Sequence, residues 1–121
     1  ERVKAKMQAI VAANSPQTTA ELRLNEPYPP MAPTEGNRAI LARLNVVNRD
    51  LGLPAMPELD PLRRGAGDIG FVAADVDGLV GLGSTGSGDH SDQETIDLTS
   101  IPLQARRAAI LMTRLSREAA E

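Results

Sequence analysis

The stretch TEGNRAILARLNVVNRDLG, residues 34–52, contains the start, the apolar face and the end of one amphipathic helix. Its large apolar residues recur at intervals of three or four, at Ile40, Leu44, Val47 and Leu51. Residues with this spacing lie on one side of a helix, where they can be buried together. Thr34 is expected to cap the first turn, and Gly52 is expected to end the helix in left-handed backbone.

The rest of any core must also come from aliphatic side chains, because Tyr28 and Phe71 are the only aromatic residues among 121. The formal net charge is -3 and no basic block stands out, so nucleic acid is not an expected partner. No apolar run approaches the roughly 18 residues that a membrane span needs, and residues 1–10 lack the apolar core of a signal peptide. A soluble protein is therefore expected, and its compartment stays open. The absence of cysteine excludes disulfides and thiolate metal sites.

Two elements and a connector are predicted before this helix. The first element, residues 1–13, is an amphipathic helix whose stripe consists of Val3, Met7, Ile10 and Val11. Residues 19–24 alternate between apolar and charged side chains, which predicts a half-buried strand. The segment NEPYPPMAP, residues 25–33, holds four prolines, so it is expected to be an extended connector or a crossing between domains.

The elements predicted after this helix are shorter, apart from the last one. A short strand is expected near residues 54–59, a helix at about 68–75, and a buried strand within DGLVGLG, residues 77–83. A long helix is expected from about residue 100 to 119. Its predicted buried stripe is Ile101, Ala105, Ala108, Met112 and Leu115. Its arginines expected to face water are Arg106, Arg114 and Arg117.

Helices that alternate with short strands predict an α/β fold built in layers. The strand at 19–24 is separated from the later strands by the proline connector, so the chain is expected to be a piece of a larger protein.

The only histidine, His90, lies in GSGDHSDQET, residues 86–95. A buried structural histidine would sit on an apolar face, whereas this one lies between Asp89 and Ser91 on a glycine-rich, flexible polar loop. Such a loop lets the backbone approach a ligand closely and aims a side chain at it. The alternative is a solvated surface loop whose histidine has no role.

The stretch GAGDIG, residues 65–70, matches the glycine spacing of a dinucleotide-binding turn. That turn needs a buried strand directly before it, and the preceding LDPLRR contains Pro61 and two arginines instead, so nucleotide binding is rejected. Arg63 and Arg64, together with the peptide N–H groups of the turn, form a candidate site for a carboxylate. The alternative is that both arginines face solvent.

Taken together, RRGAGDIGFVA and the stretch from Asp77 to Leu115 resemble the C-terminal end of the glutamate carboxypeptidase and aminoacylase family of zinc metallopeptidases. That family has a glycine-small-Asp turn, a short strand, a Gly-x-His-Ser loop, an acid four or five residues later and a long terminal helix. His90, Ser91 and Glu94 match in order and spacing. Residues 1–62 resemble the family more loosely.

The resemblance implies that residues 1–30 end an α+β lid domain that commonly forms a dimer in this family, and that residues 31–121 end the catalytic domain. His90 is implied as a ligand to one of two zinc ions, since neutral imidazole suits Zn²⁺. Either Arg63 or Arg64 resembles the contact to the substrate carboxylate. Asp68 is implied to hold its turn and Glu94 to orient the histidine loop.

The function that the resemblance implies is hydrolysis of an amide bond in a small peptide or N-acyl amino acid with a free carboxylate. The remaining zinc ligands and the general base come from N-terminal segments in this family, so the 121 residues alone are expected to be inactive. A homodimer is allowed by the resemblance. The alternative is a non-catalytic binding or dimerisation module on the same scaffold.

Overall fold

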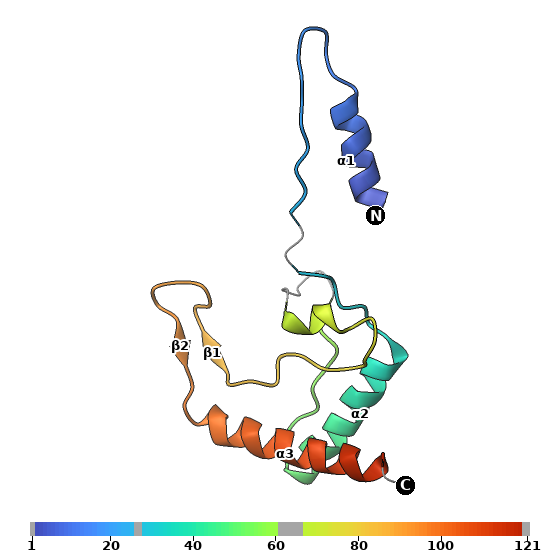
Figure 1. Ribbon diagram of the computed structural model, residues 1–121. Helices are drawn as coiled ribbons and strands as arrows, with labels where there is room; N and C mark the ends of the chain where they lie inside the picture. Colours follow the sequence, from blue (N-terminus) through green and yellow to red (C-terminus); the bar gives the residue numbers. More distant parts are fainter. Residues whose placement is uncertain (1, 26–27, 61–66, 120–121) are drawn as a thin grey trace.

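The computed structural model describes residues 2–25, 28–60 and 67–119. Within these ranges the chain forms three α-helices, a short 3₁₀ helix at Asp68–Phe71 and one two-stranded sheet (Figure 1). The α-helices and strands are α1 (Arg2–Ala12), α2 (Glu35–Asp50), β1 (Gly86–Ser87), β2 (Thr95–Ile96) and α3 (Ser100–Glu118). The chain is thus a small mixed helix–sheet structure, which agrees with the α/β prediction at that coarse level.

Helix α2 begins and ends where the sequence predicts. The Thr34 side-chain oxygen accepts a hydrogen bond from the Asn37 backbone N–H at 3.0 Å, which satisfies one of the free donors of the first turn. Gly52 adopts a positive φ of 69° after the last turn. The Leu53 N–H then donates to the Asn48 carbonyl at 2.8 Å, the long return bond that closes such helix ends.

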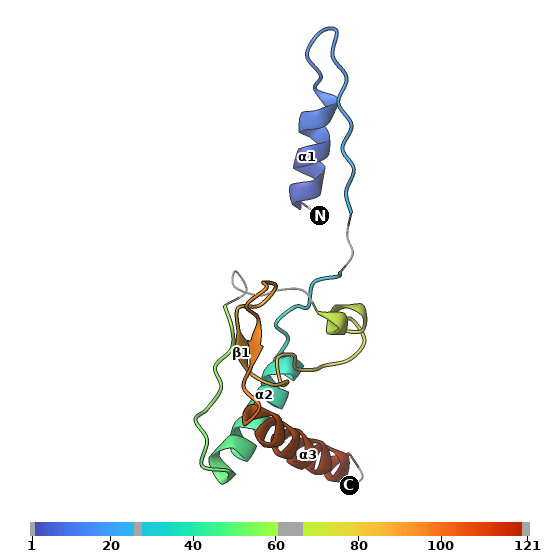
Figure 2. The same cartoon turned by 90° about the vertical axis from the view of Figure 1, so that its left-hand side faces the viewer.

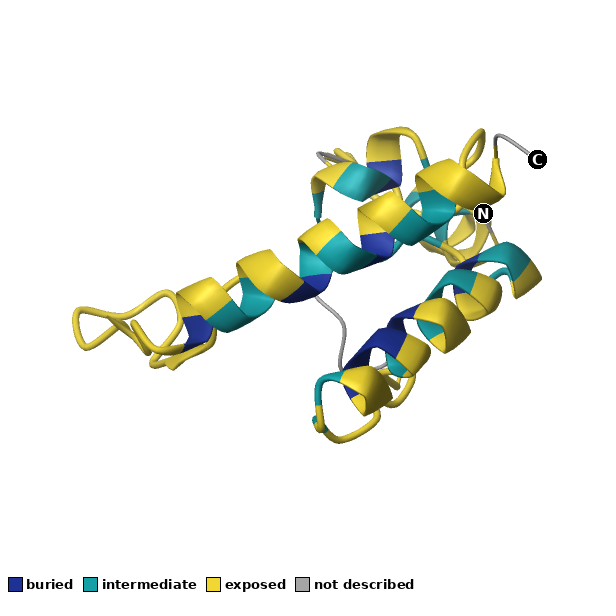
Figure 3. Cartoon of the chain, turned by 90° about the horizontal axis from the view of Figure 1, so that it is seen from below, coloured by how far each residue is buried: buried dark blue, intermediate teal, exposed yellow. Residues whose placement is uncertain are grey.

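The core is the contact between α2 and α3. Leu44 and Val47 of α2 and Leu111 of α3 are the buried apolar residues of the described chain, with 1%, 0% and 5% of their surface exposed (Figure 3). Partly buried residues around them come from both helices and from the two extended segments beside them: Leu41, Leu51, Met56, Leu79, Leu82, Ile110 and Leu115. This core is small for a chain of this length, because few apolar side chains of the described residues are fully buried and many large ones remain exposed.

The buried face of α3 differs from the predicted one. Ile101 and Met112, expected inside, are 45% and 63% exposed, whereas Leu111 and Arg107 are buried. Arg114, expected in water, reaches Asp50 of α2 at 2.7 Å and is half-buried. The helix has apolar residues on more than one side, and α2 packs against the side that contains Leu111. The predicted stripe is consequently left largely uncovered.

Polar contacts complete the packing of α2 and α3. Arg43 pairs with Glu118 at 2.7 Å, and both this pair and the Arg114 pair are partly exposed, so each contributes about 0–1 kcal/mol. Arg107 is buried, and its guanidinium donates to the Gln104 side chain at 2.6 Å and to the Met56 sulfur at 3.7 Å. Its Nε has no partner among the described residues, so the apolar contacts must outweigh an imperfectly satisfied polar group.

Helix α1 forms as predicted but packs against neither α2 nor α3. Figures 1 and 2 show it beside the extended chain that follows it, apart from the rest of the structure. No residue of α1 is buried. The strand predicted at residues 19–24 is absent: this segment is extended, forms no sheet and is exposed except for the half-buried Leu22. None of the described helices is long and apolar enough to cross a bilayer.

The other predicted strands are also absent. Residues 53–60 and 77–82 are extended chain without sheet pairing, although Leu79 and Leu82 lie against the core. An extended segment becomes a strand only when a neighbour takes up its backbone hydrogen bonds, and among the described residues only β1 and β2 pair in this way. The helix predicted at 68–75 is correct only in its first half, since the 3₁₀ helix ends at Phe71 and turns follow.

Hydrogen bonds from the start of α2 fix the position of residues 77–78, where the segment that leads to β1 begins. Thr34 donates its hydroxyl hydrogen to Asp77 at 2.9 Å, and the Gly78 N–H donates to the side-chain oxygen of Asn37 at 2.8 Å. Gly70 is buried against the carbonyl oxygen of Pro29, an approach that leaves no room for a Cβ. The third glycine of GAGDIG therefore has a packing role here.

Replacing Leu44 with alanine is expected to lower the free energy of unfolding by about 2–5 kcal/mol, because it removes one of the buried apolar side chains and leaves a cavity. Val46→Ala on the exposed side of the same helix is the matched control, with an expected change within about 0.5 kcal/mol. Urea unfolding followed by circular dichroism measures both. Equal losses in the two variants would contradict the position of the core.

Candidate functional site

His90 lies at the tip of a β-hairpin. Strands β1 and β2 pair in antiparallel fashion, with Gly86 opposite Ile96 and Ser87 opposite Thr95, and Figure 1 shows the hairpin extending away from the helices. The sequence predicted a flexible loop, whereas the chain here closes on itself through hydrogen bonds. His90 is exposed and has a φ of 62°, in the left-handed region that few non-glycine residues adopt.

Hydrogen bonds around Ser91 hold this turn. Its N–H and its hydroxyl both donate to the Gly88 carbonyl, at 3.1 Å and 2.6 Å. Its oxygen atoms also act as acceptors: the hydroxyl oxygen accepts from the Gln93 N–H at 3.2 Å, and the carbonyl accepts from the Glu94 N–H at 3.1 Å. His90 thus lies between Gly88 and Ser91, which are bonded to each other. These bonds fix its backbone and leave the imidazole in solvent.

The glycines of the loop serve the hairpin itself. A Cβ on Gly86 would meet the Thr95 carbonyl oxygen, and Gly88 combines a φ of 74° with a Cβ position 2.8 Å from the Gln93 carbonyl oxygen. Close approach of the two strands and a left-handed turn therefore account for both residues. Gly83, by contrast, has nothing within 4 Å of its Cβ position.

The base of the hairpin is joined to α3 through Asp97 and Ser100. The Asp97 N–H donates to the Thr85 carbonyl at 2.8 Å, as in a regular ladder. The Ser100 hydroxyl donates to the Asp97 carbonyl at 2.6 Å and accepts from the Thr85 N–H at 2.9 Å. The hydroxyl of the first residue of α3 is in this way part of the hairpin.

The Asp97 carboxylate stabilises the turn into α3. It accepts hydrogen bonds from the Thr99 hydroxyl at 2.7 Å and from the Thr99 N–H at 2.9 Å. These bonds favour the ionised form, so the Thr99 hydroxyl and then the Thr99 and Ser100 backbone groups hold the pKa of Asp97 below its ordinary value. The sequence DLTS, residues 97–100, is the local signal for this turn, because an Asp side chain readily binds the backbone N–H two residues further on.

The other predicted site residues do not gather around His90. Asp68 opens the 3₁₀ helix and is exposed, and Figures 1 and 2 place that helix away from the hairpin. Glu94 lies on the hairpin, where its backbone joins the turn and its side chain is exposed. Arg63 and Arg64 lie outside the described residues. The roles given to these four residues stay predictions.

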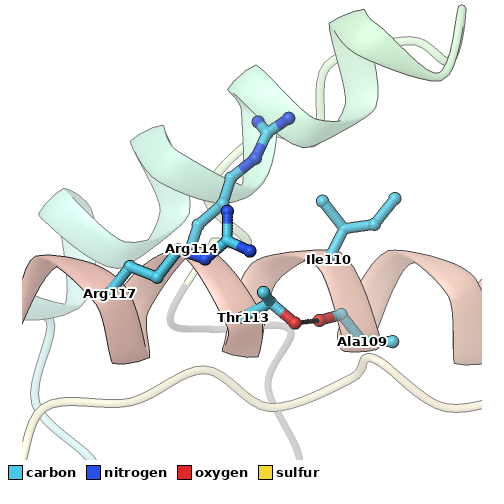
Figure 4. A pocket seen from close by; sticks show the side chains of 5 residues that line it. All are labelled: Ala109, Ile110, Thr113, Arg114 and Arg117. Atoms are coloured by element: carbon cyan, nitrogen blue, oxygen red, sulfur yellow. Dashed lines mark hydrogen bonds between the residues drawn. The ribbon is translucent and has the colours of Figure 1, made fainter.

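No cluster of three or more histidine, cysteine or carboxylate side chains suited to a metal occurs among residues 2–25, 28–60 and 67–119. His90 can therefore contribute a single imidazole. A shallow hollow of about 300 Å³ lies elsewhere, on α3 (Figure 4). It is lined by Ala109, Ile110, Thr113, Arg114 and Arg117. Its Thr113 hydroxyl donates to the Ala109 carbonyl, and its Arg114 is paired with Asp50.

Comparison with known proteins identifies no relative: no family model, curated protein or solved structure matches the chain.

Gly88→Ala is expected to destabilise the hairpin tip by about 1 kcal/mol or more, because alanine is strained at a positive φ and its Cβ would crowd the Gln93 carbonyl. Gly83→Ala is the matched control and should leave the tip unchanged. Hydrogen exchange of the Gln93 amide, which is bonded to Ser91, reports the effect. Exchange that is equally fast in both variants would show that the tip is not closed as described.

The turn at Asp97 is expected to weaken in acid. A depressed carboxylate pKa adds stability above the unfolded value of about 3.9, and that stability is lost as the pH falls through the lower folded value. The Thr99 amide NMR signal should shift with a midpoint below about 3.9. Asp97→Asn, which keeps an acceptor oxygen but cannot titrate there, should abolish the shift. A midpoint above the ordinary value would contradict the assignment.

Proposed function

We propose that this chain is the C-terminal part of a zinc-dependent amidohydrolase or carboxypeptidase, in which His90 supplies one ligand to a zinc ion. The observation that motivates the proposal is the position of the sole imidazole, exposed at the tip of a hydrogen-bonded hairpin in left-handed backbone. Backbone held in a sparsely populated region by its surroundings is common at binding and active sites.

The donor chemistry supports the contribution of one ligand and no more. Neutral imidazole binds Zn²⁺ well, and the exposed tip leaves the ring free to reach a metal held by other segments. A zinc site needs three or four protein ligands, and the described residues offer no group of that size. In this proposal, the remaining ligands come from other parts of a longer protein.

The exposed apolar surface gives further support for a larger protein. The stripe of α1 and the predicted stripe of α3 are mostly exposed, although both have the spacing of faces that become buried. Exposed residues of these two stripes are Val3, Met7, Ile10, Ile101 and Met112. In the proposed protein, the layered α/β catalytic domain would cover α3, and the lid domain would include α1.

Each predicted residue has a defined task in this proposal. When bound, zinc would polarise the amide carbonyl of the substrate and lower the pKa of a bound water. His90 would hold the metal, with Glu94 orienting its loop and Asp68 holding the glycine turn. Arg63 or Arg64 would bind the free carboxylate of a small peptide or N-acyl amino acid, because a guanidinium binds a carboxylate through two parallel hydrogen bonds.

The alternative is a binding or dimerisation module without catalysis. Such a module would present the same exposed apolar stripes to a partner. The two proposals differ in their dependence on zinc: only the enzyme requires His90 for metal binding. A His-x-Asp motif, then an Asp and an adjacent Glu-Glu pair, in the part of the gene upstream of Glu1 would favour the enzyme.

His90→Ala in the longer protein is expected to remove one equivalent of zinc and to abolish turnover of N-acyl amino acids and dipeptides. The fold should survive, because the side chain is exposed and takes no part in the core. Gln93→Ala, an exposed neighbour on the same turn, is the matched control and should keep its zinc and its rate. Metal analysis and circular dichroism on the same samples measure both properties. A folded His90→Ala protein with full zinc and normal turnover would refute the proposal.

A further inference from the structure

The hairpin that contains His90 meets the rest of the chain at one antiparallel pair, Thr85 and Asp97. These residues directly precede and follow the strand pair Gly86–Ile96. In an antiparallel ladder such a pair exchanges two hydrogen bonds, one from each N–H to the opposite carbonyl. The bond from the Asp97 N–H to the Thr85 carbonyl is present at 2.8 Å.

The second bond of this pair is replaced by a side chain. The Thr85 N–H donates to the Ser100 hydroxyl oxygen at 2.9 Å, and that hydroxyl donates to the Asp97 carbonyl at 2.6 Å. The hydroxyl is therefore inserted into the ladder, between the donor and the acceptor that would otherwise bond directly. It uses its donor and an acceptor site at once, as a hydroxyl can.

The inserted hydroxyl belongs to α3. Ser100 is the first residue of that helix and is 6% exposed, whereas residues 83–99 are exposed throughout. A buried hydroxyl with both partners made is costly to displace, because the Thr85 N–H would lose its bond and the Asp97 carbonyl would keep only the bond from the Ser100 N–H at 3.1 Å. The hairpin is exposed along its length, so its direction depends on how its base is attached to α3.

We propose that Ser100 is a positioning residue for His90: its buried hydroxyl sets the direction in which the hairpin leaves α3 and so the place to which the imidazole is delivered. The part of this inference that concerns zinc rests on the proposed function. The part that concerns the hairpin is independent of any metal and can be measured without one.

Distances between spin labels test the direction of the hairpin. The chain has no cysteine, so Asp92→Cys at the exposed tip and Met112→Cys on exposed α3 give two unique labelling positions. The labelled parent protein should give a narrow distance distribution. Ser100→Ala should shift or broaden it while the helix content stays the same.

Two further variants separate the hydroxyl from general effects of substitution. Thr113→Ala removes another hydroxyl from α3, one that donates to Ala109 within the helix, and should leave the distribution narrow. Ser100→Thr keeps the hydroxyl and should restore the narrow distribution. A narrow, unshifted distribution in Ser100→Ala would overturn the proposal. A change of equal size in Ser100→Thr would overturn it too, because side-chain volume would then be the cause.

Zinc affinity of the longer protein gives the second readout. Ser100→Ala should weaken it by about ten- to a hundredfold, the usual effect of losing a group that orients a metal ligand. Unchanged affinity in Ser100→Ala, in a protein that loses zinc on His90→Ala, would overturn the positioning role. If His90→Ala leaves zinc unchanged, the proposed function fails, and the distance measurement alone decides whether Ser100 directs the hairpin.

Discussion

The contact between α2 and α3 is the constraint on which the rest of the described structure depends. Leu44, Val47 and Leu111 exclude water from one small volume, and the extended segments on either side are placed by lying against it. Ion pairs at the edges of this contact are partly exposed and add little. The base of the hairpin is in turn bonded to the first residue of α3, so the position of the histidine depends on the same contact.

The sequence predicts an element well where residues close together in the chain determine its structure. Thr34, the apolar spacing of α2 and Gly52 define a helix without reference to any other segment, and its bounds were predicted closely. The buried face of α3 could not be predicted in this way, because that helix has apolar residues on several sides. The strands expected at 19–24 and 77–83 failed for a related reason, since a strand exists only beside a second strand.

The candidate site was likewise predicted only in part from the sequence. Composition and neighbouring residues singled out His90, but they predicted a flexible loop where the chain forms a closed hairpin. The glycines predict a loop that approaches a ligand closely, but Gly86 and Gly88 are required by the close approach of the two strands and by the left-handed turn. Ser100 could not be identified from spacing alone, because its hydroxyl binds backbone groups of the hairpin. Asp97 acts locally instead, since its carboxylate binds the N–H and the hydroxyl of Thr99, two residues further along the chain.

The hairpin also differs from the core in how far along the chain its contacts reach. The bond between Ser100 and Thr85 joins residues 15 apart, whereas the pairs between α2 and α3 join residues 64 and 75 apart. Short loops close with less loss of chain entropy and sooner than long ones. During synthesis and refolding, the turn that presents the imidazole is thus expected to take shape early, before the two helices that support it have met.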